Sequence, residues 1–207
     1  MTKEYDIIRI GLYLDPFRWQ MKYIDKILDS QKTVFTYTDV SLLLGINNND
    51  TIKSFFTRWV KEWVFVNICK WIYTLKKYNI YELSSKIKKN SYISLETVLK
   101  KEWVIFQDYG ATIFSISNNT ISKEITTHNF EYHKIKSDIL INPLWIVHQW
   151  SYMIASKERA ICDRLYLSPD YYFDNLEDLN IDLLDSISQI YSKRVILAVQ
   201  DIIKNAG

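Results

Sequence analysis

The residues best suited to contact a polyanion fall in one short segment, 50–62. Its cationic and hydroxyl side chains share one face of a predicted helix, and no acid lies within that face; they are Lys53, Ser54, Thr57, Arg58 and Lys61. Lys and Arg can bind phosphate oxygens and base edges, and short hydroxyl side chains let a helix approach closely. This segment is therefore a candidate for contact with nucleic acid.

The opposite face of segment 50–62 is apolar. Its apolar residues recur at i, i+3, i+4, i+7, i+8 and i+11, and they are Ile52, Phe55, Phe56, Trp59, Val60 and Trp63. This spacing predicts a helix with one buried side. The polar run 47–50 just before it supplies a turn and an N-cap.

Two helices are expected before this one. Asp15-Pro16 favours a helix start, because Asp can cap free amides and Pro at the first helical position loses no hydrogen bond. Apolar spacing then continues to about Ser30. Thr36 and Thr38 are candidate N-caps of a short second helix that stops at Gly45.

Two short β-prone runs follow the basic helix, at 64–67 and 70–75, close enough to pair as a hairpin. The resulting order is typical of a winged helix-turn-helix, with 50–62 as the recognition helix and 64–75 as the wing. Thr38 in the second helix and Lys70 in the wing complete the set of residues expected to contact DNA.

The charges divide the chain into a basic front and an acidic back. Residues 1–90 contain 15 Lys and Arg against 9 Asp and Glu, and residues 91–207 contain 11 against 15. We place a domain boundary near residue 90. The first domain would be the winged helix-turn-helix with an N-terminal extension. In this extension residues 4–14 are apolar, but their spacing does not decide between the period of a helix and that of a strand. The basic half suits a polyanion, and the acidic half suits a basic protein.

The second half mixes both kinds of element, so the fold class is predicted as α+β. A helix capped by Ser94 is expected to start within 92–96 and to run to about residue 103. Strands are expected at 104–106, 112–117, 121–126 and 130–135. Further helices are expected after an N-cap at Ser156, at 176–184 and at 186–204.

Common catalytic and cofactor patterns are absent from the sequence. It has no Gly-x-x-x-x-Gly-Lys loop, no Gly-x-Gly-x-x-Gly and no Gly-x-Ser-x-Gly. His128 and His133 do not have a metal-ligand spacing, and Arg159 and Asp163 are expected to form an ordinary i,i+4 helix ion pair. We therefore expect neither an enzyme nor a cofactor.

Composition places the chain among globular proteins of a reducing compartment. Its 31 Trp, Tyr and Phe residues are ample material for a core. Cys69 and Cys162 lie far apart, so no disulfide framework is expected. No export signal and no run of about 20 apolar residues is visible. A cytoplasmic location without membrane contact is expected, and the oligomeric state stays open.

Two segments of the second half resemble a known family. The run SYISLETVL at 91–99 is similar to the "YISLESAL" segment of AbiEi-type antitoxins of abortive-infection toxin–antitoxin systems. The run IASKERAICDRLYL at 154–167 is similar to that family's "IASPEKALLDLLYL" helix. The two stand in the family's order and at about its spacing. The resemblance covers roughly residues 20–200.

The resemblance implies a cytoplasmic bacterial protein with two roles. Its winged helix would repress its own operon by binding operator DNA, and its mixed α/β antitoxin domain would counteract a nucleotidyltransferase toxin. Acids on the helix at 157–167 and in the stretch 174–185 are then expected to meet the toxin. These partner-binding candidates are Glu158, Asp174, Glu177, Asp178 and Asp182.

The wing departs from the family's pattern, roughly "GLLVRIGRGVY". Trp63, Cys69 and Trp71 stand where the family has glycines, while Lys70 and Tyr73 keep their type. The alternative is therefore a protein-interaction module whose winged helix no longer binds DNA. A neighbouring gene for a nucleotidyltransferase would favour the repressor and antitoxin.

Overall fold

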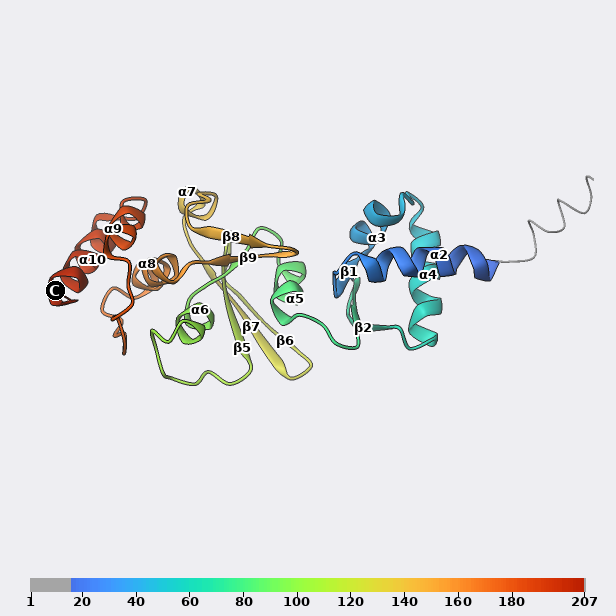
Figure 1. Ribbon diagram of the computed structural model, residues 1–207, viewed down its shortest axis with the longest axis horizontal. Helices are drawn as coiled ribbons and strands as arrows, with labels where there is room; N and C mark the ends of the chain where they lie inside the picture. Colours follow the sequence, from blue (N-terminus) through green and yellow to red (C-terminus); the bar gives the residue numbers. More distant parts are fainter. Residues whose placement is uncertain (1–15, 207) are drawn as a thin grey trace, which may run out of the picture. The chain divides into compact units, whose positions relative to one another are not determined.

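The computed structural model describes residues 16–206, with the side chains of residues 23–204 (Figure 1). The expectation for residues 4–14 lies outside the described residues. Helices and two sheets combine in an α+β fold, which confirms the predicted fold class at that level. Contacts within the chain divide it into two compact units, residues 1–78 and residues 79–207.

The first unit is a set of helices with a small antiparallel sheet. Its elements are α2 (Pro16–Asp29), β1 (Val34–Thr36), α3 (Tyr37–Leu44), α4 (Asn49–Lys61), β2 (Phe65–Cys69) and β3 (Ile72–Leu75). The sheet order is β1-β3-β2, so β3 lies between the two other strands. The strand β1 was not expected from the sequence, because three residues are too few to show a period.

Local capping fixes where the helices of the first unit begin and end. Thr36 caps α3, because its Oγ1 accepts a hydrogen bond from the backbone N–H of Asp39, whose carboxylate in turn accepts from the Thr36 N–H. Gly45 ends α3 with φ 69°, a left-handed conformation that glycine adopts at little cost. Asn48 caps α4 through the N–H groups of Asp50 and Thr51. The predicted bounds of both helices are confirmed within about two residues.

An aromatic cluster holds α4 against the sheet. The rings of Phe56 on α4 and Tyr73 on β3 stack with centroids 3.8 Å apart. Phe55 and Phe65 pack edge-on to Phe56, and Phe35 packs edge-on to Phe65. The buried side of α4 is the apolar face that the sequence predicted, and the polar side is left at the surface.

The second unit is built on a mixed six-stranded sheet of order β6-β7-β5-β4-β9-β8. Its strands are β4 (Tyr92–Ile93), β5 (Thr112–Ser117), β6 (Ile121–Ile125), β7 (His128–Lys134), β8 (Ile146–Gln149) and β9 (Tyr152–Ala155). Its helices are α5 (Ile80–Ile87), α6 (Glu96–Lys101), α7 (Ser137–Leu140), α8 (Lys157–Leu167), α9 (Ile181–Ser188) and α10 (Lys193–Ala206). Helix α8 contacts α6 and β9 as well as α9 and α10, which cover it on the side away from the sheet (Figure 1).

Several expected elements of the second unit are wrong or shifted. Residues 104–106 form no strand, because their backbone instead meets Asp174, whose N–H donates to Val104 and whose carboxylate accepts from the Phe106 N–H. Ser94 does not cap α6, since its hydroxyl donates to Asp163 and Leu95 holds the N-cap position. The strands β4, β8 and β9 were not expected. The helices expected at 176–184 and 186–204 are shorter, at 181–188 and 193–206.

The division between the units falls before α5, whereas the sequence analysis placed it near residue 90. Helix α5 belongs to the second unit because Ser84 is buried there. The Ser84 hydroxyl lies 3.1 Å from those of Ser115 and Tyr132, and the Tyr132 hydroxyl donates to the Ser84 carbonyl at 2.7 Å. A charge run at 86–89 therefore marks the end of a helix, not the boundary.

We expect Thr36→Ala to lower the free energy of unfolding of the first unit by about 1 kcal/mol, because it removes the side-chain acceptor of the capping box. Urea unfolding followed by circular dichroism measures the change. The matched control is Thr38→Ala in the first turn of the same helix, where the side chain is exposed. Equal losses for both variants would show that the cap contributes nothing specific.

Candidate functional sites

The polar face of α4 gathers the side chains that the sequence selected. Lys53, Ser54, Thr57 and Lys61 are exposed and Arg58 is half-buried. All five line one hollow on the surface, together with Asp50 and Glu62 at the two ends of the helix. The Thr57 hydroxyl donates to the Lys53 carbonyl at 2.8 Å, so it returns one hydrogen bond to its own helix. The middle of the face carries cations and hydroxyls and no acid.

The two remaining DNA-binding candidates lie outside this hollow. Thr38 is exposed in the first turn of α3, and Lys70 is exposed in the turn between β2 and β3. The ammonium of Lys70 sits over the Trp71 ring, 5.8 Å from its centroid. Both belong to the first unit, as the hypothesis requires.

The acidic candidates separate into one buried residue and four exposed ones. Glu158, expected as a surface acid, is only 7% exposed, because α8 is covered on several sides by its neighbours; this expectation is wrong. Asp174, Glu177, Asp178 and Asp182 are exposed. No Lys or Arg occurs from 165 to 192, where six Asp and Glu lie. This stretch, 165–192, is therefore a locally acidic surface.

The charge asymmetry is smaller between the two structural units than between the expected domains. Residues 1–78 contain 12 Lys and Arg against 8 Asp and Glu, and residues 79–207 contain 14 against 16. Moving the boundary transfers the three lysines and one glutamate of 79–90 to the second unit. The local clusters on α4 and in 165–192 therefore say more about partners than the totals do.

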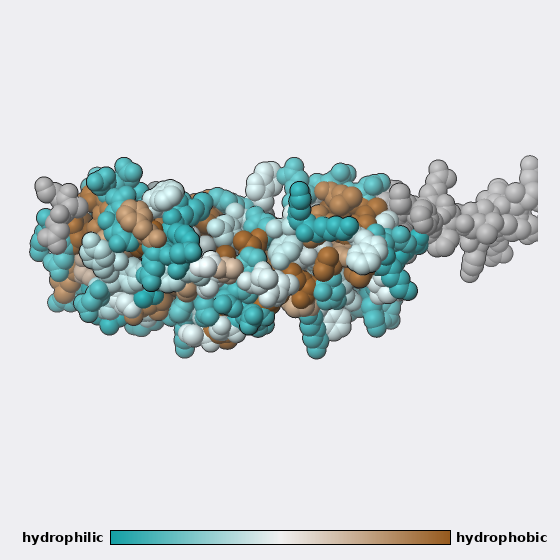
Figure 2. All heavy atoms as spheres, turned by 90° about the horizontal axis from the view of Figure 1, so that it is seen from below, coloured by the Kyte–Doolittle hydropathy of each residue, from teal (hydrophilic) through white to brown (hydrophobic). Residues whose placement is uncertain are grey.

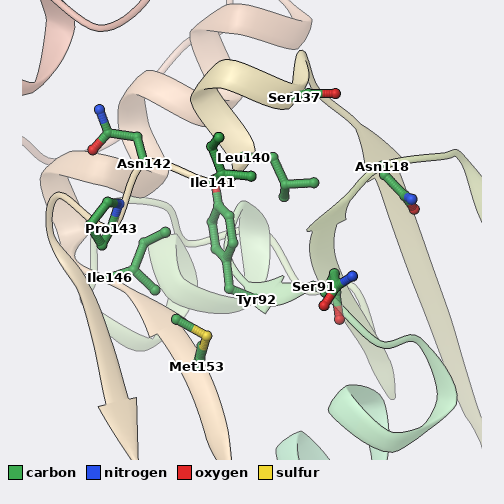
Figure 3. A pocket seen from close by; sticks show the side chains of 11 residues that line it. Ser91, Tyr92, Asn118, Ser137, Leu140, Ile141, Asn142, Pro143, Ile146 and Met153 are labelled. Atoms are coloured by element: carbon green, nitrogen blue, oxygen red, sulfur yellow. The ribbon is translucent and has the colours of Figure 1, made fainter.

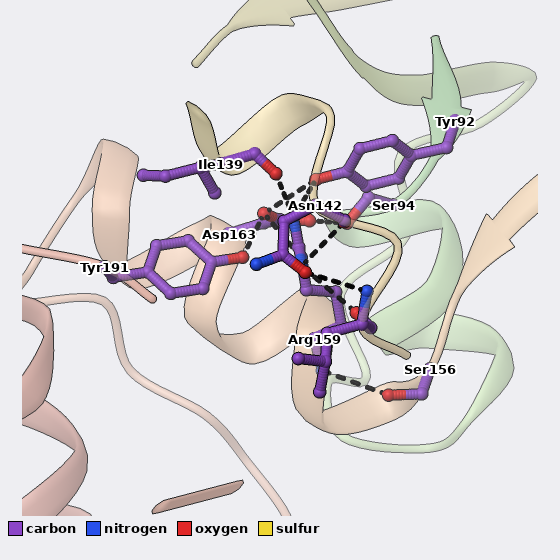
Figure 4. A network of polar contacts seen from close by, with 9 residues as sticks. Tyr92, Ser94, Ile139, Asn142, Ser156, Arg159, Asp163 and Tyr191 are labelled. Carbon is purple, nitrogen blue, oxygen red and sulfur yellow. Dashed lines mark hydrogen bonds and ion pairs between the residues drawn. The ribbon is translucent and has the colours of Figure 1, made fainter. Parts of the chain in front are cut away.

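A fully buried ion pair lies on α8 in the second unit. Arg159 and Asp163 have fully buried side chains, with the guanidinium Nε 3.6 Å from a carboxylate oxygen. The carboxylate accepts hydrogen bonds from the hydroxyls of Tyr92, Ser94 and Tyr191 at 3.0, 2.7 and 2.6 Å (Figure 4). This pair was expected as an ordinary helix ion pair, and its burial and its three hydroxyl partners were missed.

The Arg159 guanidinium ties backbone from other segments to α8. It donates to the Ile139 carbonyl at 2.7 Å, to the Leu144 carbonyl at 3.1 Å and to the Tyr92 hydroxyl at 3.2 Å (Figure 4). The rings of Tyr92 and Tyr191 lie over it, with centroids 5.6 and 5.4 Å away. One side chain therefore connects α7, the loop before β8, and β4.

Burial sets the protonation of this network. Complete burial raises the pKa of the Asp163 carboxyl, and Arg159 and the hydroxyl donors oppose the rise. Burial, together with the charge of Asp163, raises the pKa of Tyr92 and of Tyr191 well above the ordinary value, so both remain neutral donors. The charged pair at the centre of this network is thus out of contact with solvent, and its phenol partners stay neutral.

A second pocket of about 390 Å³ opens beside this network. Tyr92 contributes its ring to the wall and points toward Leu140 and Ile141 (Figure 3). The other lining residues are apolar or neutral, and they include Asn118, Asn142 and Met153. No Asp, Glu, His, Lys, Arg or Cys side chain is among the residues that line this pocket.

The sequence's possible metal ligands are not brought together. His128 and His133 lie on opposite faces of β7, because side chains alternate along a strand and the two are five residues apart. Among the described residues, no group of three or more His, Cys, Asp or Glu side chains is placed to hold a metal ion. Cys162 is a free, fully buried cysteine, and burial raises the pKa of its thiol far above the ordinary value.

Large hydrophobic side chains are exposed between α7 and β9. They are Ile141, Leu144, Trp145, Val147, Trp150 and Met153. Segment 139–156 has no Asp, Glu, Lys or Arg, and β8 forms one edge of the sheet. Figure 2 shows one face of the molecule, on which hydrophobic side chains (brown) reach the surface between hydrophilic ones (teal). Such surface is suited to contact with another protein.

The comparisons with known proteins assign no family. No family model matches the chain, and a search among curated proteins gave no match. Within residues 16–206, no helix has both the length and the apolar character needed to cross a membrane.

We expect Arg159→Met to destabilise the second unit by about 3–5 kcal/mol, because it leaves the Asp163 carboxylate buried without its cation. Urea unfolding monitored by circular dichroism measures the loss. The matched control is Arg194→Met, which removes an exposed guanidinium that donates to the Tyr166 carbonyl. A loss no larger than that of the control would contradict the role given to Arg159.

Stability should fall as the pH drops below about 6.5, in part through His133. Burial lowers the pKa of this histidine in the folded state, so the unfolded chain takes up its proton first. The loss begins near the unfolded value and levels off below the folded one. We expect His133→Gln to flatten this part of the pH dependence of the urea midpoint. The control is His148→Gln, at an exposed position on β8, which should not flatten it. An unchanged slope in His133→Gln would refute the assignment.

Proposed function

We propose that the first unit is a winged helix-turn-helix that binds duplex DNA through α4. The observation that carries this is the polar face of α4, where Lys53, Arg58 and Lys61 stand beside two hydroxyls with no acid among them. A recognition helix in the major groove needs cationic and short polar side chains on its outer face.

The order of elements supports the same proposal. A helix, a short strand, two helices joined by a tight turn, and a hairpin that closes a sheet in the order β1-β3-β2 form the layout of winged helices. In that layout α3 and α4 form the helix-turn-helix, and the β2–β3 turn, with Lys70, is the wing. Thr38 would contact the phosphate backbone from the start of α3.

The second unit is proposed as the antitoxin part of the protein. Its segments 91–99 and 154–167 resemble AbiEi-type antitoxins, and its acidic surface at 165–192 suits a partner with a cationic cleft. A nucleotidyltransferase toxin must bind phosphates, so its cleft would carry such charges. Charge complementarity would mainly speed the encounter. The protein would then be a cytoplasmic autorepressor and antitoxin.

The second candidate function is a protein-interaction module that does not bind DNA. The exposed hydrophobic side chains between α7 and β9 favour it, because they could dock a protein without any contribution from α4. The two functions differ in one readout, the retardation of DNA by the intact protein.

We expect Arg58→Glu combined with Lys61→Glu to abolish retardation of the DNA fragment upstream of the protein's own gene. Each lost phosphate contact should also lower the slope of log K against log salt by about one. The control makes the same charge change in the second unit, with Lys123→Glu and Lys134→Glu at exposed strand positions. Unchanged retardation by the α4 variant would eliminate the DNA-binding proposal in favour of the interaction module.

A separation-of-function test addresses the antitoxin role in the full chain. We expect Asp178→Lys with Asp182→Lys to lose protection of cells that express the neighbouring toxin, while DNA retardation is kept. The control pair is Glu124→Lys with Asp138→Lys, which removes two exposed acids elsewhere in the same unit. Growth rescue is the measurement. If only the α4 variant fails to rescue, protection comes from repression and not from contact with the toxin.

A further inference from the structure

Five tryptophans occupy backbone conformations that favour glycine. Their φ angles lie between 46° and 66°, and they are Trp63, Trp71, Trp103, Trp145 and Trp150. All five side chains are substantially exposed, from 46% to 83%. A bulky residue with positive φ is a rare outlier, because its Cβ crowds the neighbouring carbonyl oxygen. Strain of this kind calls for an explanation at each position.

Two of the five close helices in the manner of a glycine. After α4, the Trp63 N–H donates to the Val60 carbonyl at 3.1 Å and the Val64 N–H to the Trp59 carbonyl at 2.9 Å. This pair of bonds defines a Schellman motif, whose left-handed residue is most often glycine.

The same motif ends α6 at Trp103. Its N–H donates to the Lys100 carbonyl at 3.1 Å, and the Val104 N–H donates to the Leu99 carbonyl at 2.8 Å. In α3 the chain places Gly45 at the corresponding left-handed position, with φ 69°. The fold therefore uses glycine for this purpose where the sequence has one.

The other three strained tryptophans lie beside strands. Trp71 is in the turn between β2 and β3, Trp150 is in the two-residue turn between β8 and β9, and Trp145 immediately precedes β8. Tight hairpin turns need left-handed residues and favour Gly or Asn, because other side chains resist this φ. The three side chains remain 46% to 83% exposed, so none of them is buried in a core in return for the strain.

The strain is concentrated in one residue type. Five of the seven tryptophans have positive φ, and the other non-glycine residues with positive φ in the described part of the chain are only Gln31, Asn90, Leu95 and Thr126. The chain has only 4 glycines in 207 residues, against an average of about 7% in proteins. The chain is thus poor in glycine and has tryptophan at five positions whose backbone conformation favours glycine.

The two remaining tryptophans lie in ordinary helical backbone. Trp19 is within α2, and Trp59 is within α4, where it is buried in the core of the first unit. A docking role for tryptophan would account for exposure, but it would not account for five left-handed backbones in helix caps and turns. The division into two groups follows backbone conformation.

We propose that the gene specifies these five positions with UGA codons, that its own cell reads UGA as glycine, and that the protein made there carries glycine at all five. The codon UGA differs from the tryptophan codon UGG only in its third base. Some genetic codes assign UGA to tryptophan and others assign it to glycine, whereas UGG encodes tryptophan in both. A gene translated with the wrong one of these codes therefore shows tryptophan in place of glycine at every UGA codon and is unchanged at every UGG codon. Trp19 and Trp59 are then genuine tryptophans encoded by UGG.

The first test is the nucleotide sequence together with the protein's mass. We expect UGA at codons 63, 71, 103, 145 and 150 and UGG at codons 19 and 59. Peptides of the protein isolated from its own cells should have the masses that correspond to glycine at the five positions. UGG at the five codons, or peptide masses with tryptophan there, overturns the proposal.

The second test measures the strain directly. The chain with all five Trp→Gly substitutions should melt higher than the chain with seven tryptophans, by about 2–4 °C for each substitution that relieves strain. The control is Trp59→Gly, which empties a buried helical position and should lower the melting temperature. A fivefold variant that melts at or below the tryptophan chain contradicts the proposal.

The proposal also bears on the wing, and this consequence alone rests on the proposed DNA binding. Trp71→Gly removes the ring that lies over the Lys70 ammonium and that packs against Tyr37, with centroids 5.1 Å apart. Lys70 is then able to reach a phosphate, and DNA affinity should rise severalfold. If codons, masses and melting agree while affinity does not change, the glycine assignment stands and the role of the wing is rejected.

Discussion

The second unit depends on a charge pair that is fully buried. Arg159 and Asp163 lie one turn apart on α8, and both are removed from water. Such a pair is tolerated when its other polar atoms find partners. Three hydroxyls, those of Tyr92, Ser94 and Tyr191, donate to the carboxylate, and backbone carbonyls accept from the guanidinium. Because these partners come from separate segments, satisfying the pair fixes how the sheet and helices meet. The segments that resemble the antitoxin family, 91–99 and 154–167, supply four of the five residues.

The first unit is organised by aromatic packing and contains no comparable buried ion pair among its described residues. Stacking of Phe56 on Tyr73 and the edge contact of Phe56 with Phe65 hold α4 by its apolar face. Burial of the apolar face determines which residues of the helix face water. The cationic and hydroxyl side chains of α4 are exposed because they lie on the side opposite the core. A surface suited to DNA is thus a direct result of the packing behind it.

Strained backbone at tryptophan occurs in both units, and it bears on which residue the cell places at these positions. A left-handed conformation costs a residue with a side chain about 1–2 kcal/mol. Two such tryptophans lie in the first unit and three in the second, and in each unit they would take up a substantial part of the about 5–15 kcal/mol by which a domain is usually stable. Glycine at these positions removes that cost. It would also remove Trp145 and Trp150 from the exposed hydrophobic surface, which weakens the case for the interaction module.

The starts of several helices and the exposed face of α4 were determined by the sequence itself. The caps at Thr36, Asn48 and Ser156 were predictable because a cap bonds to backbone only two or three residues away. The spacing of apolar residues likewise defined the two faces of α4. Partners distant in sequence were decided only by the tertiary structure. Ser94 was expected to cap a helix and instead donates to Asp163.

The same limit accounts for the other differences. The strand β1 exists only because β3 pairs with it, β4 only because β5 and β9 flank it, and Glu158 is buried only because other helices cover α8. Left-handed backbone at the tryptophans is also invisible in sequence, since the residue type argues against it. Local hydrogen bonds and periodicity involve residues that are close together in the sequence, whereas burial and strand pairing depend on which distant segments the fold brings together.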